Sequence, residues 1–103
     1  MIAKLVSFQL PKDMSRDEVV AAAQEAAEEW IKHPKLLRKD FLLDENNMTY
    51  GYYLFPDRES AEAAHDETFM KQLKDRFGVE AEIEYFDYLM TADASKGSIG
   101  EAQ

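Results

Sequence analysis

The sequence predicts a single α+β domain whose strands and helices follow one another in the order β-α-β-β-α-β. Three observations support this fold class. Apolar residues alternate along four short segments, which is typical of strands. Two longer segments carry apolar residues at helical spacing. The chain has 103 residues, which is the length of one domain with a single modest core.

The first strand is predicted over residues 2–9, where apolar side chains occupy both faces. Ser15 followed by Glu18 is the capping-box pattern of a helix start, and the helix is predicted from about 16 to 32. It ends there because Pro34 disfavours helical backbone at the residue before it.

Residues 36–44 and 48–55 each alternate, and the Glu-Asn-Asn sequence between them is a turn signal, so they are predicted to form a hairpin. The second helix is predicted from Asp57, a suitable N-cap, to Gly78, which can end a helix in a left-handed turn. The pattern allows a break in this helix near residues 66–68.

The last strand is predicted over residues 79–90. Its first half is apolar on one face only, whereas Phe86 and Tyr88 make the second face apolar as well. The polar and small residues of 93–103 predict a flexible C-terminal tail after a domain that spans 1–92.

This order of strands and helices predicts a ferredoxin-like fold, in which a four-stranded antiparallel sheet has both helices on one face. The strands supply apolar side chains for the other face too. An uncovered apolar face on an acidic protein needs a partner. We therefore expect a homodimer in which two sheets pack against each other.

Composition excludes several classes of function. The net charge of −9 argues against binding to nucleic acid or to anionic membranes. No apolar run approaches the roughly 20 residues that span a membrane. The absence of cysteine is compatible with a cytoplasmic location. No nucleotide-binding or hydrolase motif is present, and no cofactor is expected.

The central segment MTYGYYLF suggests a ligand site. If Gly51 faces the helices, its missing side chain leaves a slot beneath the alanine-rich first helix, with Tyr53 and Trp30 as walls. A flat aromatic molecule would fit this slot, and Tyr85 and Phe86 complete the predicted binding set. The alternative is that these rings are packed core and interface.

Two histidines and one lysine are the candidate polar groups. His33 lies at a helix C-terminus, where the helix dipole favours a proton, and His65 shares a face with apolar residues. Each is a candidate catalytic acid or base, or alternatively a capping or half-buried residue. Lys39 is the one charged residue on an otherwise apolar face of its strand. Its side chain either extends to solvent at the edge of this face or binds an anionic substrate. No metal is expected, because His65 and its acidic neighbours do not share a helical face.

The sequence resembles the YdhR-like proteins over about residues 3–92. The matching runs are HPKLLRK at 33–39, LLDE at 42–45, YGYYLF at 50–55, RESAEA at 58–63, RFGV at 76–79 and IEYF at 83–86.

This resemblance implies the dimeric α+β barrel shared with the antibiotic-biosynthesis monooxygenases, which act on polycyclic aromatic substrates without a metal, flavin or haem. The expected function is therefore a cofactor-independent monooxygenase-like enzyme for an aromatic or polyketide-like molecule. The RedY-like proteins of pigment and bisindole biosynthesis are similar in length and layout and imply an alternative, cyclisation or condensation. A non-catalytic dimer that binds small molecules is a further alternative.

Overall fold

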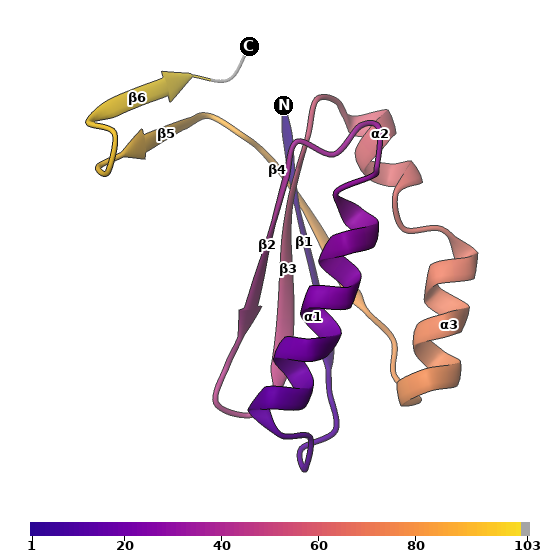
Figure 1. Cartoon of the computed structure of the whole chain (residues 1–103). Coiled ribbons are helices and arrows are strands. Elements are labelled where there is room, and N and C mark those ends of the chain that lie inside the picture. The colour runs from indigo at the N-terminus through magenta and orange to yellow at the C-terminus, as the bar shows by residue number, and fades with distance from the viewer. Residues whose placement is uncertain (102–103) are drawn as a thin grey trace.

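The computed structural model describes residues 1–101, which form a four-stranded sheet with helices on one face and a separate hairpin (Figure 1). The elements, in chain order, are β1 (Ile2–Gln9), α1 (Arg16–Trp30), β2 (Arg38–Leu43), β3 (Met48–Phe55), α2 (Arg58–Ala63), α3 (Glu67–Phe77), β4 (Glu82–Asp87), β5 (Met90–Asp93) and β6 (Ser98–Glu101).

The main sheet has the order β2-β3-β1-β4 and is antiparallel throughout. In this register Gly51 lies opposite Val6 on one neighbouring strand and Phe41 on the other. The helices lie on one side of this sheet (Figure 1). The predicted ferredoxin-like α+β fold is therefore confirmed.

The predicted start of α1 is confirmed in atomic detail. The Glu18 amide donates to the Ser15 hydroxyl at 3.2 Å, and the Ser15 amide donates to the Glu18 carboxylate at 3.0 Å. The helix ends at Trp30, slightly before the predicted end. The next turn is tighter, since the Lys32 amide donates to the Glu29 carbonyl, three residues back, at 3.2 Å.

The second helical segment is divided into α2 and α3 at the break that the sequence allowed. The Asp66 carboxylate starts α3 by accepting a hydrogen bond from the Phe69 amide at 3.0 Å. Gly78 ends this helix with a φ of 69°, as predicted. The break leaves His65 between two helices rather than on the face of one.

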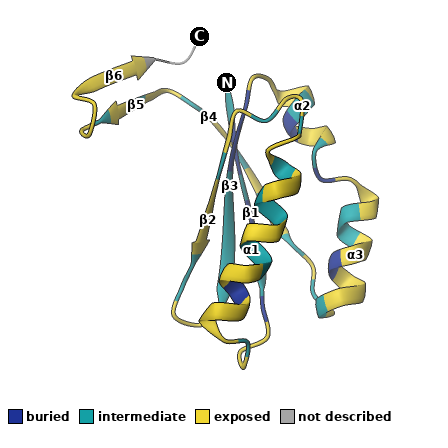
Figure 2. Cartoon of the chain, in the orientation of Figure 1, coloured by how far each residue is buried: buried dark blue, intermediate teal, exposed yellow. Residues whose placement is uncertain are grey.

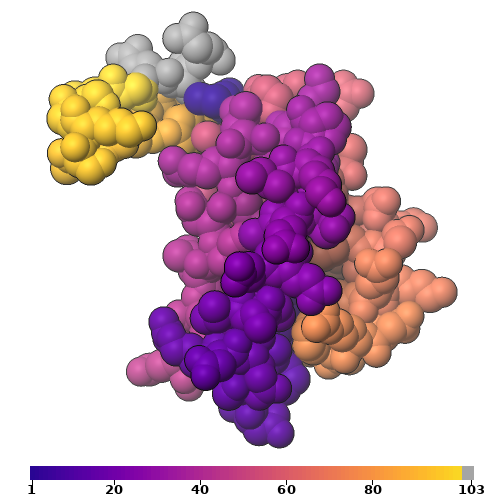
Figure 3. All heavy atoms as spheres, viewed as in Figure 1, coloured from indigo at the N-terminus to yellow at the C-terminus, as the bar shows by residue number. Residues whose placement is uncertain are grey.

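The C-terminal region differs from the prediction. β4 ends at Asp87, inside the strand predicted over 79–90. The segment 93–103, predicted to be a flexible tail, contains β6 and the last residue of β5, and these two strands pair with each other and with no other described element. The turn between them forms because the Asp93 carboxylate accepts hydrogen bonds from the Ser95 hydroxyl at 2.6 Å and the Lys96 amide at 3.3 Å. The hairpin projects from one end of the molecule (Figure 3). Residues 102–103 of the predicted tail lie outside the described residues.

The core lies between the central strands and the helices (Figure 2). Val6, Tyr53 and Phe55 pack there with Ala61 of α2. Lys4 is also wholly buried, and its ammonium donates to the Ala61 carbonyl at 2.6 Å. Among residues 1–101, none of the helices combines the length and the apolar character that crossing a membrane requires.

The opposite face of the sheet has no helix over it (Figure 1). Leu42 and Phe86 point to this side and are 52% and 49% exposed. Leu5 and Tyr52 lie on the same face and are half-buried. We call this the outer face of the sheet.

Candidate functional site: a cavity between the helices and the sheet

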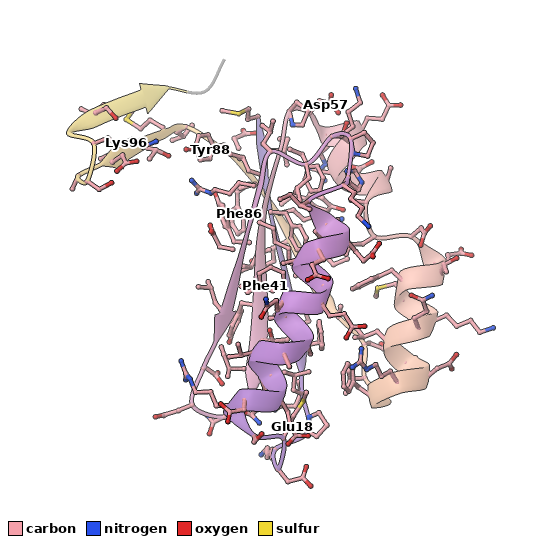
Figure 4. The ribbon with its side chains drawn as sticks, viewed as in Figure 1. Glu18, Phe41, Asp57, Phe86, Tyr88 and Lys96 are labelled. Atoms are coloured by element: carbon pink, nitrogen blue, oxygen red, sulfur yellow. The ribbon has the colours of Figure 1, made fainter. Side chains whose placement is uncertain are left out.

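A cavity of about 520 Å³ lies between α1, α3 and the helix-facing side of the sheet. This volume falls within the range of roughly 300–1,000 Å³ that is typical of small-molecule sites. Phe41, one of the residues that line the cavity, is labelled in Figure 4. The apolar lining comes from the sheet (Val6, Phe8, Phe41, Gly51, Tyr53), from α1 (Val19, Ala22, Ala23, Ala26, Trp30) and from α3 (Phe69, Leu73, Phe77).

Gly51 has a specific steric role. A Cβ built at this position would lie 2.7 Å from Cε1 and 3.1 Å from the hydroxyl of Tyr53, so the Tyr53 ring occupies the space that the missing side chain leaves. The predicted empty slot above Gly51 is therefore filled by the chain's own tyrosine. Tyr53 is 2% exposed, its burial raises the pKa of its hydroxyl, and its ring meets Trp30 edge-on at 4.9 Å.

Lys39 is the charged residue that enters the aromatic part of the cavity. Its Nζ lies 4.1 Å from the Phe41 ring centroid, 4.5 Å from that of Tyr53 and 5.0 Å from that of Trp30. Within residues 1–101 no carboxylate pairs with it. Burial lowers the pKa of its amine from 10.5 to about 7. At neutral pH this group can therefore either accept or donate a proton.

His65 lies directly behind the cavity wall. Its ring contacts Tyr53 at 4.6 Å, Phe69 at 4.7 Å and Trp30 at 5.1 Å, and these three rings line the cavity whereas His65 does not. Both ring nitrogens are buried and have no hydrogen-bond partner among the described residues. Burial, and then the charges of Lys4 and Lys39, lower the pKa of His65 to about 3. The imidazole is therefore neutral at pH 7.

His33 lies in the turn after α1 rather than in the cavity. Its Nδ1 accepts a hydrogen bond from the Lys35 amide at 3.2 Å. Its ring stacks on Trp30 at 5.6 Å and meets Phe55 edge-on at 5.9 Å. These contacts give His33 a structural role in closing the turn.

The two candidates from the last strand are separated from the cavity. Tyr85 faces the helices but lies under α2, with the Arg58 guanidinium 4.2 Å from its ring centroid. Phe86 points to the outer face of the sheet. Of the predicted site residues, the cavity brings together Trp30, Lys39, Gly51 and Tyr53, and it does not include His33, His65, Tyr85 or Phe86.

Several lining residues were not singled out as site residues from the sequence. Phe69, Leu73 and Phe77 repeat at helical spacing, and that pattern also fits a packed core. Phe41 alternates with polar residues in β2, as any half-buried strand residue does. The signal in the sequence for these residues was the large number of aromatic rings predicted on one side of the sheet. That signal does not distinguish a packed core from a cavity.

No group of three or more His, Cys, Asp or Glu residues in positions 1–101 could hold a metal ion. The cavity lining itself contains no acidic residue. Its only side chains with nitrogen or oxygen atoms are Trp30, Tyr50, Tyr53 and Thr49, together with Gln72 and three cations described below. We therefore assign no metal site to the described residues.

No sequence-family profile matches this chain, and no curated protein sequence does. Solved structures do match. A crystal structure of an antibiotic biosynthesis monooxygenase superposes with a TM-score of 0.63 at 18% identity, covering 86% of this chain and 99% of that one. The chain has the fold of that monooxygenase structure.

Two further structures support this assignment. A putative antibiotic biosynthesis monooxygenase from Nitrosomonas europaea superposes with a TM-score of 0.57 at 20% identity, covering 86% of this chain and 99% of that one. Rv0793 from Mycobacterium tuberculosis superposes with a TM-score of 0.64 at 11% identity, covering 89% of this chain and 98% of that one. At these identities the comparisons establish the fold, and the chemistry has to be argued from the cavity.

Proposed function

We propose that this protein is a cytoplasmic, cofactor-independent monooxygenase-like enzyme that binds a flat aromatic or polyketide-like molecule in the cavity. The observation that carries the proposal is the Lys39 amine, which is held among three aromatic rings at the cavity wall and has a pKa of about 7. The likeness to monooxygenase structures adds support at the level of fold.

Binding would depend on ring stacking and apolar contact. Trp30 and Phe41 offer aromatic surfaces on two sides of the cavity, and the alanines of α1 leave room between helix and sheet. Tyr53 also lines the cavity, and its hydroxyl would be the polar group that orients a substrate.

Lys39 is proposed as the group that moves the proton. In its neutral form the amine would take a proton from an acidic hydroxyl or activated CH₂ group of the substrate, leaving a substrate anion beside an ammonium ion. The anion is electron-rich and can reduce dioxygen directly. Attack of the anion on dioxygen forms a C–O bond, and cleavage of the O–O bond with loss of the second C–H proton turns the carbon into a carbonyl. One oxygen atom stays in the product and the other leaves as hydroxide with that second proton, so the substrate supplies all the electrons. Lys39 would return its proton to the departing hydroxide.

His33 and His65 were the proton-transfer candidates from the sequence, and Lys39 is favoured over both because it lines the cavity. The nitrogens of His65 are closed off by the wall. His65 would instead act as a positioning residue that supports the rings of Tyr53 and Phe69.

A second copy of the chain is proposed to cover the outer face of the sheet, as expected from the sequence. The exposed Leu42 and Phe86 support this, because an apolar surface of this kind is costly to leave in water. Sedimentation velocity should give a dimer, and the double variant Leu42→Glu, Phe86→Glu should give a folded monomer. A wild-type monomer at micromolar concentration would refute this part of the proposal.

The function is tested with a tricyclic anthrone as substrate in an oxygen electrode. We expect one O₂ consumed per quinone formed, and Lys39→Met should lower kcat by about 10²–10⁴-fold. Lys71→Met, which removes an exposed lysine outside the cavity, is the matched control. Turnover without oxygen uptake would favour the cyclisation or condensation alternative. Binding without any turnover would favour the non-catalytic dimer.

A further inference from the structure

The charges around the cavity are opposite in sign to those of the protein as a whole. The chain has 21 acidic and 12 basic residues. Three basic residues line the cavity, Arg16, Lys39 and Arg76, and no acidic residue does. An acidic protein with a cation-lined cavity has a local preference for anions.

The three cations lie in two groups. Arg16 is the first residue of α1 and Arg76 is the penultimate residue of α3. Figure 1 shows the start of α1 and the end of α3 at the same end of the molecule. Lys39 instead lies beside Trp30, at the opposite end of α1. The rise of an α-helix puts the two ends of α1 about 20 Å apart. The cavity is therefore elongated, with positive charge toward each end.

The two arginines are available for a ligand. Within residues 1–101 neither forms an ion pair. Both are exposed, and the guanidinium of Arg76 lies 5.0 Å from the Phe77 ring centroid. Arg76 therefore has an aromatic neighbour, but in the described part of the chain neither guanidinium has a carboxylate partner.

We infer that the substrate is an elongated aromatic acid, whose reacting ring lies beside Lys39 and whose anionic group binds between Arg16 and Arg76. This inference rests on the proposed function of the cavity and adds the substrate's chemical class and its orientation. Arginine suits this role because its planar guanidinium matches the geometry of a carboxylate.

The inference is tested by isothermal titration calorimetry with 4″-hydroxy-p-terphenyl-4-carboxylate, whose three rings suit the elongated cavity, and with its uncharged amide, which has nearly the same shape. Wild-type protein should bind the acid about tenfold more tightly than the amide. The double variant Arg16→Gln, Arg76→Gln should lose this preference while its affinity for the amide stays unchanged. Each exposed charge pair contributes modestly, so about 2–5-fold per arginine is expected.

Lys71→Gln is the matched control, because it removes one positive charge from an exposed position on α3 outside the cavity. It should leave the preference intact. Quenching of Trp30, the only tryptophan, reports whether either probe enters the cavity. Far-UV circular dichroism checks that each variant is folded.

The outcomes test the inferred substrate class and the proposed function separately. If wild type binds acid and amide equally, the inferred substrate class is wrong while the aromatic cavity stands. If Lys71→Gln reduces the preference as much as the arginine variants do, the preference reflects overall charge, and the inference also fails. If neither probe binds or quenches Trp30, the proposed function itself fails.

Discussion

Replacing Lys39 with methionine should stabilise the protein at low pH and leave its stability unchanged at high pH. Methionine has a similar length and no charge, so it fills the same space among Trp30, Phe41 and Tyr53. The lysine ammonium, in contrast, is partly desolvated and has no carboxylate partner in the described chain. The variant therefore removes a cost that the wild type bears whenever Lys39 is protonated.

The sign and size follow from the pKa of Lys39. Its folded-state pKa of about 7 lies below the ordinary value of 10.5, so the unfolded chain binds more protons between these values and stability rises with pH across that window. The full difference corresponds to at most about 5 kcal/mol. Attraction of the ammonium to the three aromatic rings, at about 0.5–1 kcal/mol for each ring, offsets about half of this cost. We expect a net advantage of about 2 kcal/mol for Lys39→Met at pH 6.

Urea denaturation of both proteins at pH 6, 8 and 10 measures this advantage. Taking the difference between variant and wild type cancels Lys4 and Tyr53, whose pKa values do not depend on Lys39. The pKa of His65 does depend on Lys39, but it lies at about 3, so folded His65 is neutral throughout this pH range. The advantage should fall toward zero by pH 10, and Lys71→Met should show no such trend. An advantage that stays constant from pH 6 to pH 10 would refute the claim that Lys39 is desolvated.

Three further predictions follow from particular contacts. Gly51→Ala should destabilise the protein by about 1–3 kcal/mol, because the new Cβ would lie 2.7 Å from the Tyr53 ring; thermal unfolding measures this, and Gly100→Ala, with nothing within 4 Å, is the control. His65→Phe should reduce the fall in the free energy of unfolding between pH 6.5 and about 3, since wild-type His65 has a folded-state pKa of about 3 and gains a proton on unfolding in this range. If urea denaturation shows the same fall for variant and wild type, the burial of a neutral imidazole is contradicted. Asp66→Ala should lower the free energy of unfolding in urea by about 1 kcal/mol, because it removes the carboxylate that accepts a hydrogen bond from the Phe69 amide at the start of α3. Asp75→Ala, at an exposed position within α3, should lower it by less.

Most of the fold could be predicted because its signals are local. The capping box at Ser15 and the glycine at position 78 act within a few residues, and the structure contains both as predicted. The hairpin of β5 and β6 was missed because its strands are four residues each and lie among small and polar residues. Its stability depends on the Asp93 turn, which periodicity does not reveal.

The candidate site was only partly predictable because burial and distance are not local properties. The sequence predicted Gly51, Tyr53 and Trp30 on one side of the sheet, which strand alternation and helix spacing are enough to suggest, and all three line the cavity. It did not show that the Tyr53 ring folds back over Gly51, which depends on side-chain rotamer and packing. The two histidines looked more suitable than Lys39 for proton transfer, because an ordinary lysine has a pKa near 10.4. The burial that lowers the pKa of Lys39 is a property of the fold that the sequence does not show.

Lys4, which is buried, and Lys39, which is half-buried, differ in a way that bears on function. Lys4 is wholly buried, but its ammonium donates to the Ala61 carbonyl at 2.6 Å and links β1 to α2, so the fold uses it. Lys39 has no hydrogen bond or ion pair among the described residues, and a methionine would pack in its place. A charged group that costs stability and makes no hydrogen bond between elements is best explained by what enters the cavity beside it. Stability and turnover of the one variant Lys39→Met therefore decide the role of this lysine. If the variant is more stable than wild type and has lost turnover, Lys39 serves the ligand rather than the fold.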